Sequence, residues 1–278
     1  MGEIINLFFK FKSLIEIREF RLRFFSTIIL FTTLFLLFLI GNPFFVIFLT
    51  FLFSLLFYEF ETIDSTNVTK SKFLKLFIIQ SSLLIYLFLK MNLLIFDSFY
   101  NVEIVLISSF VINLIYYKKY NNLISFIISN CIILSFYSLI NILLLANGLN
   151  LFLYLVILIS VMDITAYLGG KLLGNKKIIP KVSRGKTIEG TFVGLGSTIF
   201  VSFLIKDLIN LDVLISLFLG FSIAILSFLG DILESFFKRK IGVKDSGKLI
   251  PGHGGLMDRL DGYVIVLPFF YIFLISFY

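Results

Sequence analysis

The sequence is poor in charged residues, which make up 15% of its 278 positions, against about 25% in soluble domains. This small number of charges cannot cover the surface of a globular protein. A soluble protein is therefore excluded, and lipid is expected to be the main solvent. Its single cysteine, Cys131, excludes an intramolecular disulfide and a zinc site built from cysteines. It has no tryptophan, so any aromatic belt at the membrane surface must be built from tyrosine.

Long apolar runs take the place of the missing charge. Each is close to the length that crosses about 30 Å of hydrocarbon as a helix, whereas an open sheet in lipid would leave backbone groups unpaired. The runs cover 24–40, 43–60, 73–89, 101–117, 123–145, 150–170, 190–205, 211–230 and 262–278. The sequence therefore predicts an all-α integral membrane protein with about nine transmembrane helices.

The distribution of lysine and arginine predicts the orientation. With the N-terminus in the cytoplasm and the C-terminus outside, only two of the 24 basic residues, Lys90 and Lys206, fall on the outer side. This bias accounts for the net charge of +7 without a nucleic-acid partner. We expect a multi-pass protein of the cytoplasmic membrane.

Three regions are expected along the chain. Residues 1–23 read as a basic amphipathic segment on anionic headgroups, and no cleavable signal peptide is evident. Residues 24–149 form N-terminal transmembrane helices that carry no motif. Residues 150–278 form a catalytic region with two cytoplasmic motif loops, 171–189 and 231–261.

Four aspartates stand at or near the expected inner ends of the C-terminal helices. Asp163 follows an apolar run, where an ionisable residue usually faces a polar cavity. Asp231 is similarly placed, and Asp258 and Asp261 share one face of a helix. Carboxylates in a chain with one cysteine and one histidine suit Mg²⁺ or Mn²⁺.

Glycines, lysines and arginines surround these acids, which is typical of phosphate binding. His253 lies in Pro-Gly-His-Gly-Gly, where a structural or phosphate-contacting role is as plausible as acid–base work. The residues thus indicate a divalent-metal and polyphosphate site at the cytoplasmic face. A membrane-embedded phosphotransfer enzyme with one water-soluble and one lipid substrate fits this pattern best.

Two motifs carry a family resemblance. The first contains Asp163-x-x-Ala-Tyr-x-x-Gly and Ser183-x-x-Lys-Thr-x-Glu-Gly. The second contains Ser235-x-Phe-Lys-Arg, Lys244-Asp-Ser-Gly, Leu249-Ile-Pro-Gly-His-Gly-Gly and Met257-Asp-Arg-Leu-Asp. From 163 to 262 the chain resembles the phosphatidate cytidylyltransferase (CDP-diacylglycerol synthase) family.

The resemblance implies a reaction of CTP with phosphatidic acid to give CDP-diacylglycerol and pyrophosphate, with Mg²⁺ (or Mn²⁺) as cofactor. It also suggests a homodimer as the assembly. It implies Asp231 and Asp258 as metal ligands. The remaining expected roles are catalytic for Asp261, Asp163 and Lys244, and substrate-binding for Lys186, Lys238, Arg239, His253 and Arg259.

Two other functions stay open on the sequence. A CTP-dependent lipid or polyprenol kinase would share the physics of the site but release a phosphomonoester. An ion-coupled transporter also uses acids within the membrane, although here the acids gather at one face and no inverted repeat is visible.

Overall fold

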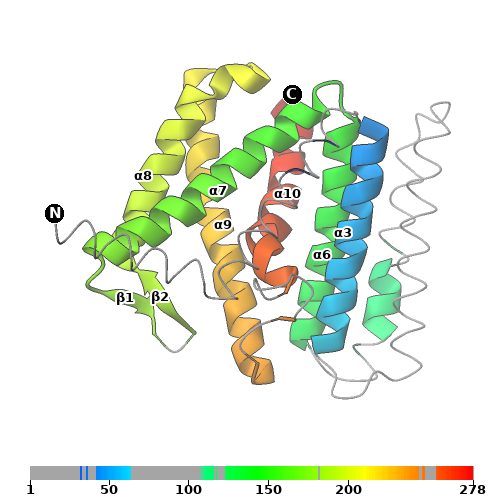
Figure 1. The fold of residues 1–278 in the computed structure, drawn as a ribbon. Helices are drawn as coiled ribbons and strands as arrows, with labels where there is room; N and C mark the ends of the chain where they lie inside the picture. Colours follow the sequence, from blue (N-terminus) through cyan, green and yellow to red (C-terminus); the bar gives the residue numbers. More distant parts are fainter. Residues whose placement is uncertain are drawn as a thin grey trace.

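A computed structural model describes residues 32, 36, 42–63, 107, 109–115, 117, 123–180, 182–243, 246–247 and 255–277. This part of the chain is mostly helical, as predicted (Figure 1). Its long helices are α3 (Asn42–Ile63), α6 (Leu123–Leu144), α7 (Gly148–Leu173), α8 (Ile188–Leu204), α9 (Val213–Ile241) and α10 (Met257–Phe277).

Four helices are long and apolar enough to cross a membrane, by length and composition. They comprise α7, α9, α10 and the stretch Ser125–Leu143 of α6. The apolar stretch Ile47–Phe60 of α3 and the helix α8 (Ile188–Leu204) are shorter than these four. The predicted segment 1–23 and the predicted spans 24–40 and 73–89 lie almost entirely outside the described residues. The count of nine and the orientation therefore stay predictions.

The helices pack side by side around a shared apolar core. In Figure 1, α3 and α6 lie next to each other, while α7 crosses obliquely in front of α9. Tyr154 of α7, Phe60 of α3 and Phe270 of α10 are among the largest fully buried side chains. Phe60 also meets Phe237 of α9, with ring centroids 5.2 Å apart, so α3 packs against the C-terminal half of the chain.

Small residues bring α7 and α8 unusually close. A Cβ on Gly190 would lie 2.5 Å from the carbonyl oxygen of Ala166 and 2.7 Å from Cα of Gly170. Without a hydrophobic effect between helices in lipid, close packing of small residues is a main source of helix association. This contact fixes the start of α8 against the end of α7.

The second motif differs from the loop expected over 231–261. Residues 231–241 continue α9, and α10 already begins at Met257. The polar residues of this stretch are interspersed with apolar ones such as Phe236 and Phe237. Because Phe237 is buried, the stretch packs against the rest of the protein and can continue as a helix. Gly242, with φ of 86°, then ends α9 in the left-handed conformation that glycine adopts without strain.

The all-helical prediction missed a short hairpin between α7 and α8. Strands β1 (Lys177–Ile179) and β2 (Ser183–Thr187) pair antiparallel. Thr187 closes the hairpin and begins α8, because its side chain accepts a hydrogen bond from the N–H of Gly190 at 3.2 Å. The hairpin thus leads directly into the helix that packs on α7.

Candidate active site

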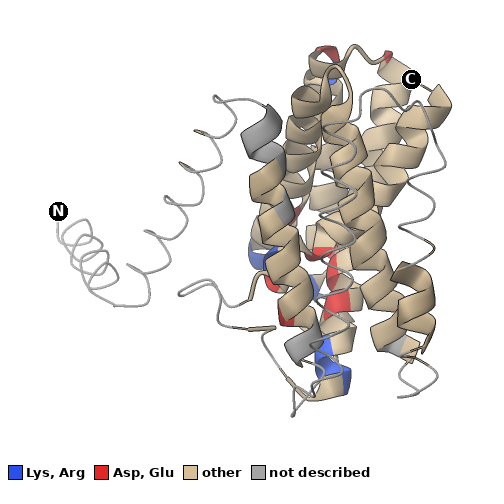
Figure 2. Ribbon diagram, turned by 90° about the vertical axis from the view of Figure 1, so that its right-hand side faces the viewer, with Lys and Arg blue, Asp and Glu red and all other residues tan. Residues whose placement is uncertain are grey.

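Charged side chains gather toward one end of the helix bundle. Figure 2 shows most of the acidic and basic residues in its lower half, with a small group at the opposite end. The small group includes Lys206 and Asp207, which pair at 2.6 Å in the connection between α8 and α9. The larger group lies on the hairpin, the second half of α9 and the start of α10.

Three carboxylates converge where α9 and α10 cross. One oxygen from each of Asp231, Glu234 and Asp261 lies within 4.8 Å of the other two, and we call this set the three-acid cluster. Two glycines permit the crossing, because a Cβ on Gly230 would lie 2.5 Å from the carbonyl oxygen of Asp261 and 3.1 Å from Cα of Gly262. Each glycine is a chain neighbour of an aspartate, so close backbone contact brings the acids together.

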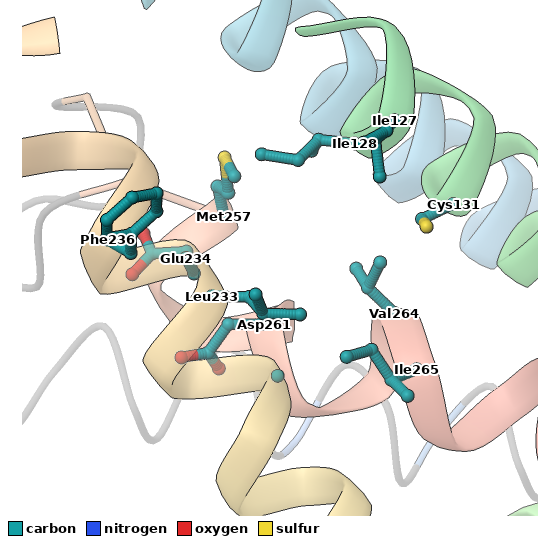
Figure 3. Close-up of a pocket in the computed structure, with 11 residues that line it drawn as sticks. Ile127, Ile128, Cys131, Leu233, Glu234, Phe236, Met257, Asp261, Val264 and Ile265 are labelled. Carbon is teal, nitrogen blue, oxygen red and sulfur yellow. The ribbon is translucent and has the colours of Figure 1, made fainter. Parts of the chain in front are cut away.

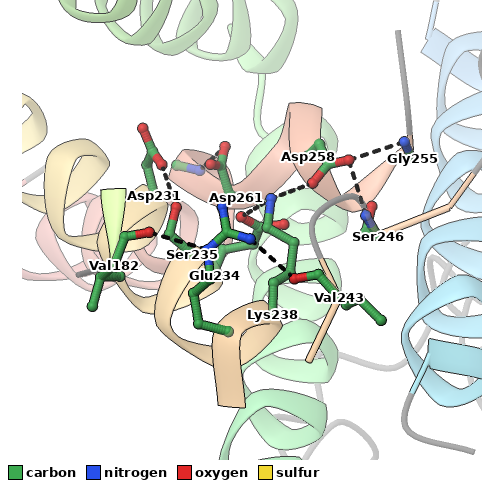
Figure 4. A network of polar contacts seen from close by, with 12 residues as sticks. Val182, Asp231, Glu234, Ser235, Lys238, Val243, Ser246, Gly255, Asp258 and Asp261 are labelled. Atoms are coloured by element: carbon green, nitrogen blue, oxygen red, sulfur yellow. Dashed lines mark hydrogen bonds and ion pairs between the residues drawn. The ribbon is translucent and has the colours of Figure 1, made fainter. Parts of the chain in front are cut away.

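Lys238 joins the three-acid cluster to Asp258 (Figure 4). Its Nζ lies 2.8 Å from Oε2 of Glu234 and 2.5 Å from Oδ1 of Asp258, and its side chain is 12% exposed. The other oxygen of Asp258 accepts backbone N–H groups of Ser246 at 3.1 Å and Gly255 at 3.0 Å. The structure therefore places Asp258 beside the three-acid cluster, with both oxygens engaged, and its role as a metal ligand stays a prediction.

Lys186 reaches the same cluster from β2. Its Nζ lies 2.6 Å from Oδ2 of Asp231 and 4.8 Å from the ring centroid of Phe228. Both partners belong to α9, so a cation–π contact and an ion pair hold the lysine against this helix. Ser235 adds a hydrogen bond to Oδ1 of Asp231 at 3.3 Å, which leaves Asp231 oriented by two neighbours.

The other predicted residues on described segments lie around this centre. Asp163 of α7 is exposed and close enough to Asp231, Lys186 and Arg259 to interact electrostatically. Arg239 lies on α9 and donates to the carbonyl oxygens of Val182 at 3.4 Å and Val243 at 3.3 Å. In this structure Arg239 therefore ties the hairpin to the end of α9.

Lys244 and His253 lie outside the described residues, so their predicted roles are not placed in the structure. Conversely, the list of candidate residues drawn from the sequence omitted Glu234 and Glu59. Glu234 stands three residues after Asp231, which puts both carboxylates on one face of α9. Glu59 is an acid near the end of an apolar helix, and that position alone marks a residue for attention.

An apolar cavity of about 160 Å³ opens beside the three-acid cluster. Figure 3 shows side chains of α6, including Cys131, facing Val264 and Ile265 of α10 across it. Glu234 and Asp261 also belong to its lining, on the side away from Cys131, but their carboxylate oxygens point away from the cavity, whose wall is almost entirely apolar. The cavity is thus an apolar space between membrane-length helices that lies next to the charged centre.

The donor set suits a hard divalent cation. Mg²⁺ prefers carboxylate oxygens, and the three-acid cluster offers one from each of three residues. Oε1 of Glu234 is buried and accepts no hydrogen bond from the described residues, which leaves it free to act as a ligand. Among the described side chains here, the three-acid cluster, Asp163 and Asp258 carry five formal negative charges, and three cations, Lys186, Lys238 and Arg259, offset part of them. A divalent cation would balance the two negative charges that remain.

Comparison with known proteins bears on this arrangement. A family model described as the cytidylyltransferase family matches residues 21–277. The phosphatidate cytidylyltransferase of Staphylococcus epidermidis strain RP62A is 41% identical over 133 residues, and that of Staphylococcus aureus strain COL is 40% identical over the same length. Each alignment covers 47% of this chain and 51% of the relative.

A protein of Escherichia coli strain K12, named uncharacterized protein YnbB, is 46% identical over 129 residues. This alignment covers 46% of the chain and 43% of that protein. The chain thus spans about half the length of the curated relatives it matches. The likeness is therefore established in detail for part of the chain, while the family model extends over nearly all of it.

Proposed function

Because the chain belongs to the cytidylyltransferase family, we propose that it transfers the cytidylyl group of CTP to phosphatidic acid in phospholipid biosynthesis. A phosphate oxygen of the lipid would attack the α-phosphorus of CTP and form a new P–O bond. The bond between the α-phosphorus and the bridging oxygen to the β-phosphate would break. CDP-diacylglycerol and pyrophosphate would result.

The position of the apolar cavity carries this proposal. A lipid substrate needs an apolar space for its acyl chains next to a polar centre for its headgroup. The cavity lies between α6, α9 and α10, and Glu234 and Asp261 lie at its edge. A diacyl lipid that placed part of an acyl chain there would have its phosphate near the three-acid cluster, which supports a lipid acceptor over a wholly soluble one.

The side chains of the site suit a reaction between two anions, whose barrier is largely electrostatic. Lys186 and Lys238 are held by acids of α9 and α10, so their ammonium groups are positioned before substrate arrives. They would attract the triphosphate and offset charge on the leaving pyrophosphate. We propose that these two lysines, Arg239 and Arg259 contact the phosphates of the substrates. We propose the same role for Lys244 and His253, which belong to the second motif but lie outside the residues that the structure describes.

We propose Asp231, Glu234 and Asp261 as the residues that would hold Mg²⁺ or Mn²⁺. The ion, when bound, would supply Lewis-acid polarisation of a phosphoryl oxygen. Asp163, across from these acids on α7, would orient Lys186 or a cation at the edge of the site. Asp258, the ligand implied by the resemblance, remains a candidate for the same ion, and metal titration can separate it from the other three.

The remaining proposals concern topology and assembly. We propose nine transmembrane helices in the cytoplasmic membrane, with the N-terminus inside and the C-terminus outside. This arrangement follows from the positive-inside distribution and puts the charged end of the bundle in contact with cytosolic CTP. We also propose that the protein forms a homodimer, as the resemblance implies.

Purified protein incubated with CTP, phosphatidic acid and Mg²⁺ tests the reaction, with mass spectrometry of the lipid products. We expect CDP-diacylglycerol and an equal amount of pyrophosphate, and no product in excess EDTA. Diacylglycerol or a polyprenol offered in place of phosphatidic acid tests the kinase alternative. A phosphomonoester formed from either one, with no CDP-diacylglycerol from phosphatidic acid, would replace the proposed function by that of a kinase.

A further inference from the structure

Glu59 of α3 reaches into the second motif from the N-terminal half of the chain. Its side chain is 3% exposed, although it stands in an otherwise apolar helix. Oε1 accepts the hydroxyl hydrogen of Ser246 at 2.5 Å, and Oε2 accepts the backbone N–H of Leu256 at 2.7 Å. These partners lie 187 and 197 residues further along the sequence, so the contacts connect distant parts of the chain.

Two glycines of the second motif leave the space that the Glu59 carboxylate occupies. A Cβ on Gly255 would lie 1.7 Å from Oε1 of Glu59 and 1.8 Å from Oγ of Ser246. A Cβ on Gly247 would lie 2.8 Å from the same carboxylate oxygen. Any other residue at Gly255 would therefore displace the carboxylate, the hydroxyl or the backbone.

Asp258 binds Ser246 as well, together with Gly255, the neighbour of Leu256. Its Oδ2 accepts the backbone N–H groups of Ser246 and Gly255, whereas Glu59 takes the hydroxyl of Ser246 and the N–H of Leu256. Figure 4 shows the two contacts of Asp258. One carboxylate from α3 and one from α10 thus both bind Ser246 and the pair Gly255–Leu256.

We propose that Glu59 is a positioning residue for nucleotide binding, which rests on the proposed function. By holding Ser246 and Leu256, it sets the positions of the N–H groups of Ser246 and Gly255, which Asp258 accepts. Asp258 in turn pairs with Lys238, one of the lysines proposed to contact the nucleotide phosphates. A carboxylate suits this task because both partners are donors and it is an acceptor with two oxygens. These charge-assisted hydrogen bonds offset the cost of burying the charge. Glu59 touches Ser246 and Leu256 and would act through them.

Four single variants test the proposal. Glu59→Ala removes both acceptors, and Gly255→Ala displaces the carboxylate while leaving it in the sequence. Glu59→Gln is the conservative variant, because its amide oxygen can accept from Leu256 while its amide nitrogen donates to the hydroxyl oxygen of Ser246, which can rotate. Gly196→Ala in α8 is the matched glycine control, since nothing lies within 4 Å of a Cβ there.

Steady-state kinetics distinguish positioning from a general loss of folded protein. Losing charge-assisted hydrogen bonds is expected to raise KM for CTP about 10- to 100-fold in Glu59→Ala and Gly255→Ala. KM for phosphatidic acid should change less than about twofold, and Glu59→Gln should stay within about threefold of the wild type for CTP. An unchanged KM for CTP in Glu59→Ala, with kcat reduced in proportion to the folded fraction, would overturn the proposal.

Hydrogen exchange measured without substrates supplies a second readout that does not depend on the reaction. The amide of Leu256 should exchange about tenfold faster in Glu59→Ala than in wild type, while peptides within α7 and α8 stay unchanged. Equal exchange at Leu256 would refute the contact between Glu59 and the motif. If the wild type and Gly196→Ala form no CDP-diacylglycerol, the proposed function fails. In that case exchange at Leu256, with CTP affinity measured by equilibrium dialysis, still decides the role of Glu59.

Discussion

Replacing Asp258 by asparagine separates two roles for this residue, because the substitution keeps the shape of the side chain and removes its charge. In the structure Oδ1 of Asp258 lies 2.5 Å from Nζ of Lys238, and Oδ2 accepts N–H groups of Ser246 and Gly255. Asparagine has one oxygen, which can serve the two backbone donors. Its NH₂ group would then face the ammonium of Lys238 and place two donors together.

The size of the effect follows from that lost ion pair. Side chains of Lys238 and Asp258 are 12% and 14% exposed, so solvent replaces the contact poorly. A hydrogen bond to a charged group contributes about 1.5–3 kcal/mol, which is about 10- to 100-fold in rate if the transition state loses all of it. We therefore expect kcat/KM for CTP to fall by about that factor in Asp258→Asn.

Titration with Mg²⁺ decides between this role and direct metal binding. In Asp258→Asn the Mg²⁺ concentration for half-maximal activity should change less than about threefold, whereas in Asp231→Asn it should rise about tenfold or more. Asp212→Asn is the matched control, because Asp212 precedes α9 at its other end and makes no capping hydrogen bond there. If Asp258→Asn raises the Mg²⁺ requirement as much as Asp231→Asn does, Asp258 is a ligand and the reasoning is wrong.

Three further predictions address topology, the cavity and the helix crossing. In a Cys131→Ala background, cysteines at Lys176 and Lys248 should resist impermeant reagents in intact cells while a tag after Tyr278 is reached; labelling of either cysteine from outside would refute the topology. Cys131→Phe should narrow the cavity and raise KM for phosphatidic acid but not for CTP, with Cys131→Ala near wild type. Gly230→Ala should cost about 1–3 kcal/mol by overpacking, seen as a lower melting temperature in detergent; an unchanged value would contradict the close crossing.

The helical part of the fold could be predicted because apolar length alone specifies a membrane helix. The predicted run 43–60 corresponds to α3, and 123–145 corresponds to α6 within a residue at its C-terminal end. The ends of the long helices were harder to place. Residues 231–241 mix Lys238, Arg239 and other polar residues with aromatic ones. The apolar run in the sequence therefore ends before the helix does. Its true end at Gly242 depends on local backbone conformation.

The candidate site could be predicted only in part, for a similar reason. Motif spacing identified Asp231 and Asp261 as chemically important, and the structure brings both into one cluster with Glu234. Spacing does not tell which carboxylates share a centre, because that depends on how α9 and α10 cross. Local patterns could mark Glu59 as an acid in an apolar helix but could not identify its partners, since these come from a segment almost 200 residues away.

The close crossing of α9 and α10 explains why the acids collect at one point. Acids near the membrane are costly to bury and repel one another, so apolar packing alone would not assemble them. The backbone contact between Gly230 and Asp261 holds two helices together independently of the charges beside it. Lys186 and Lys238 then offset part of the repulsion, and the remaining negative charge favours a divalent cation. The metal affinity that we propose for this site would thus arise from a backbone packing constraint.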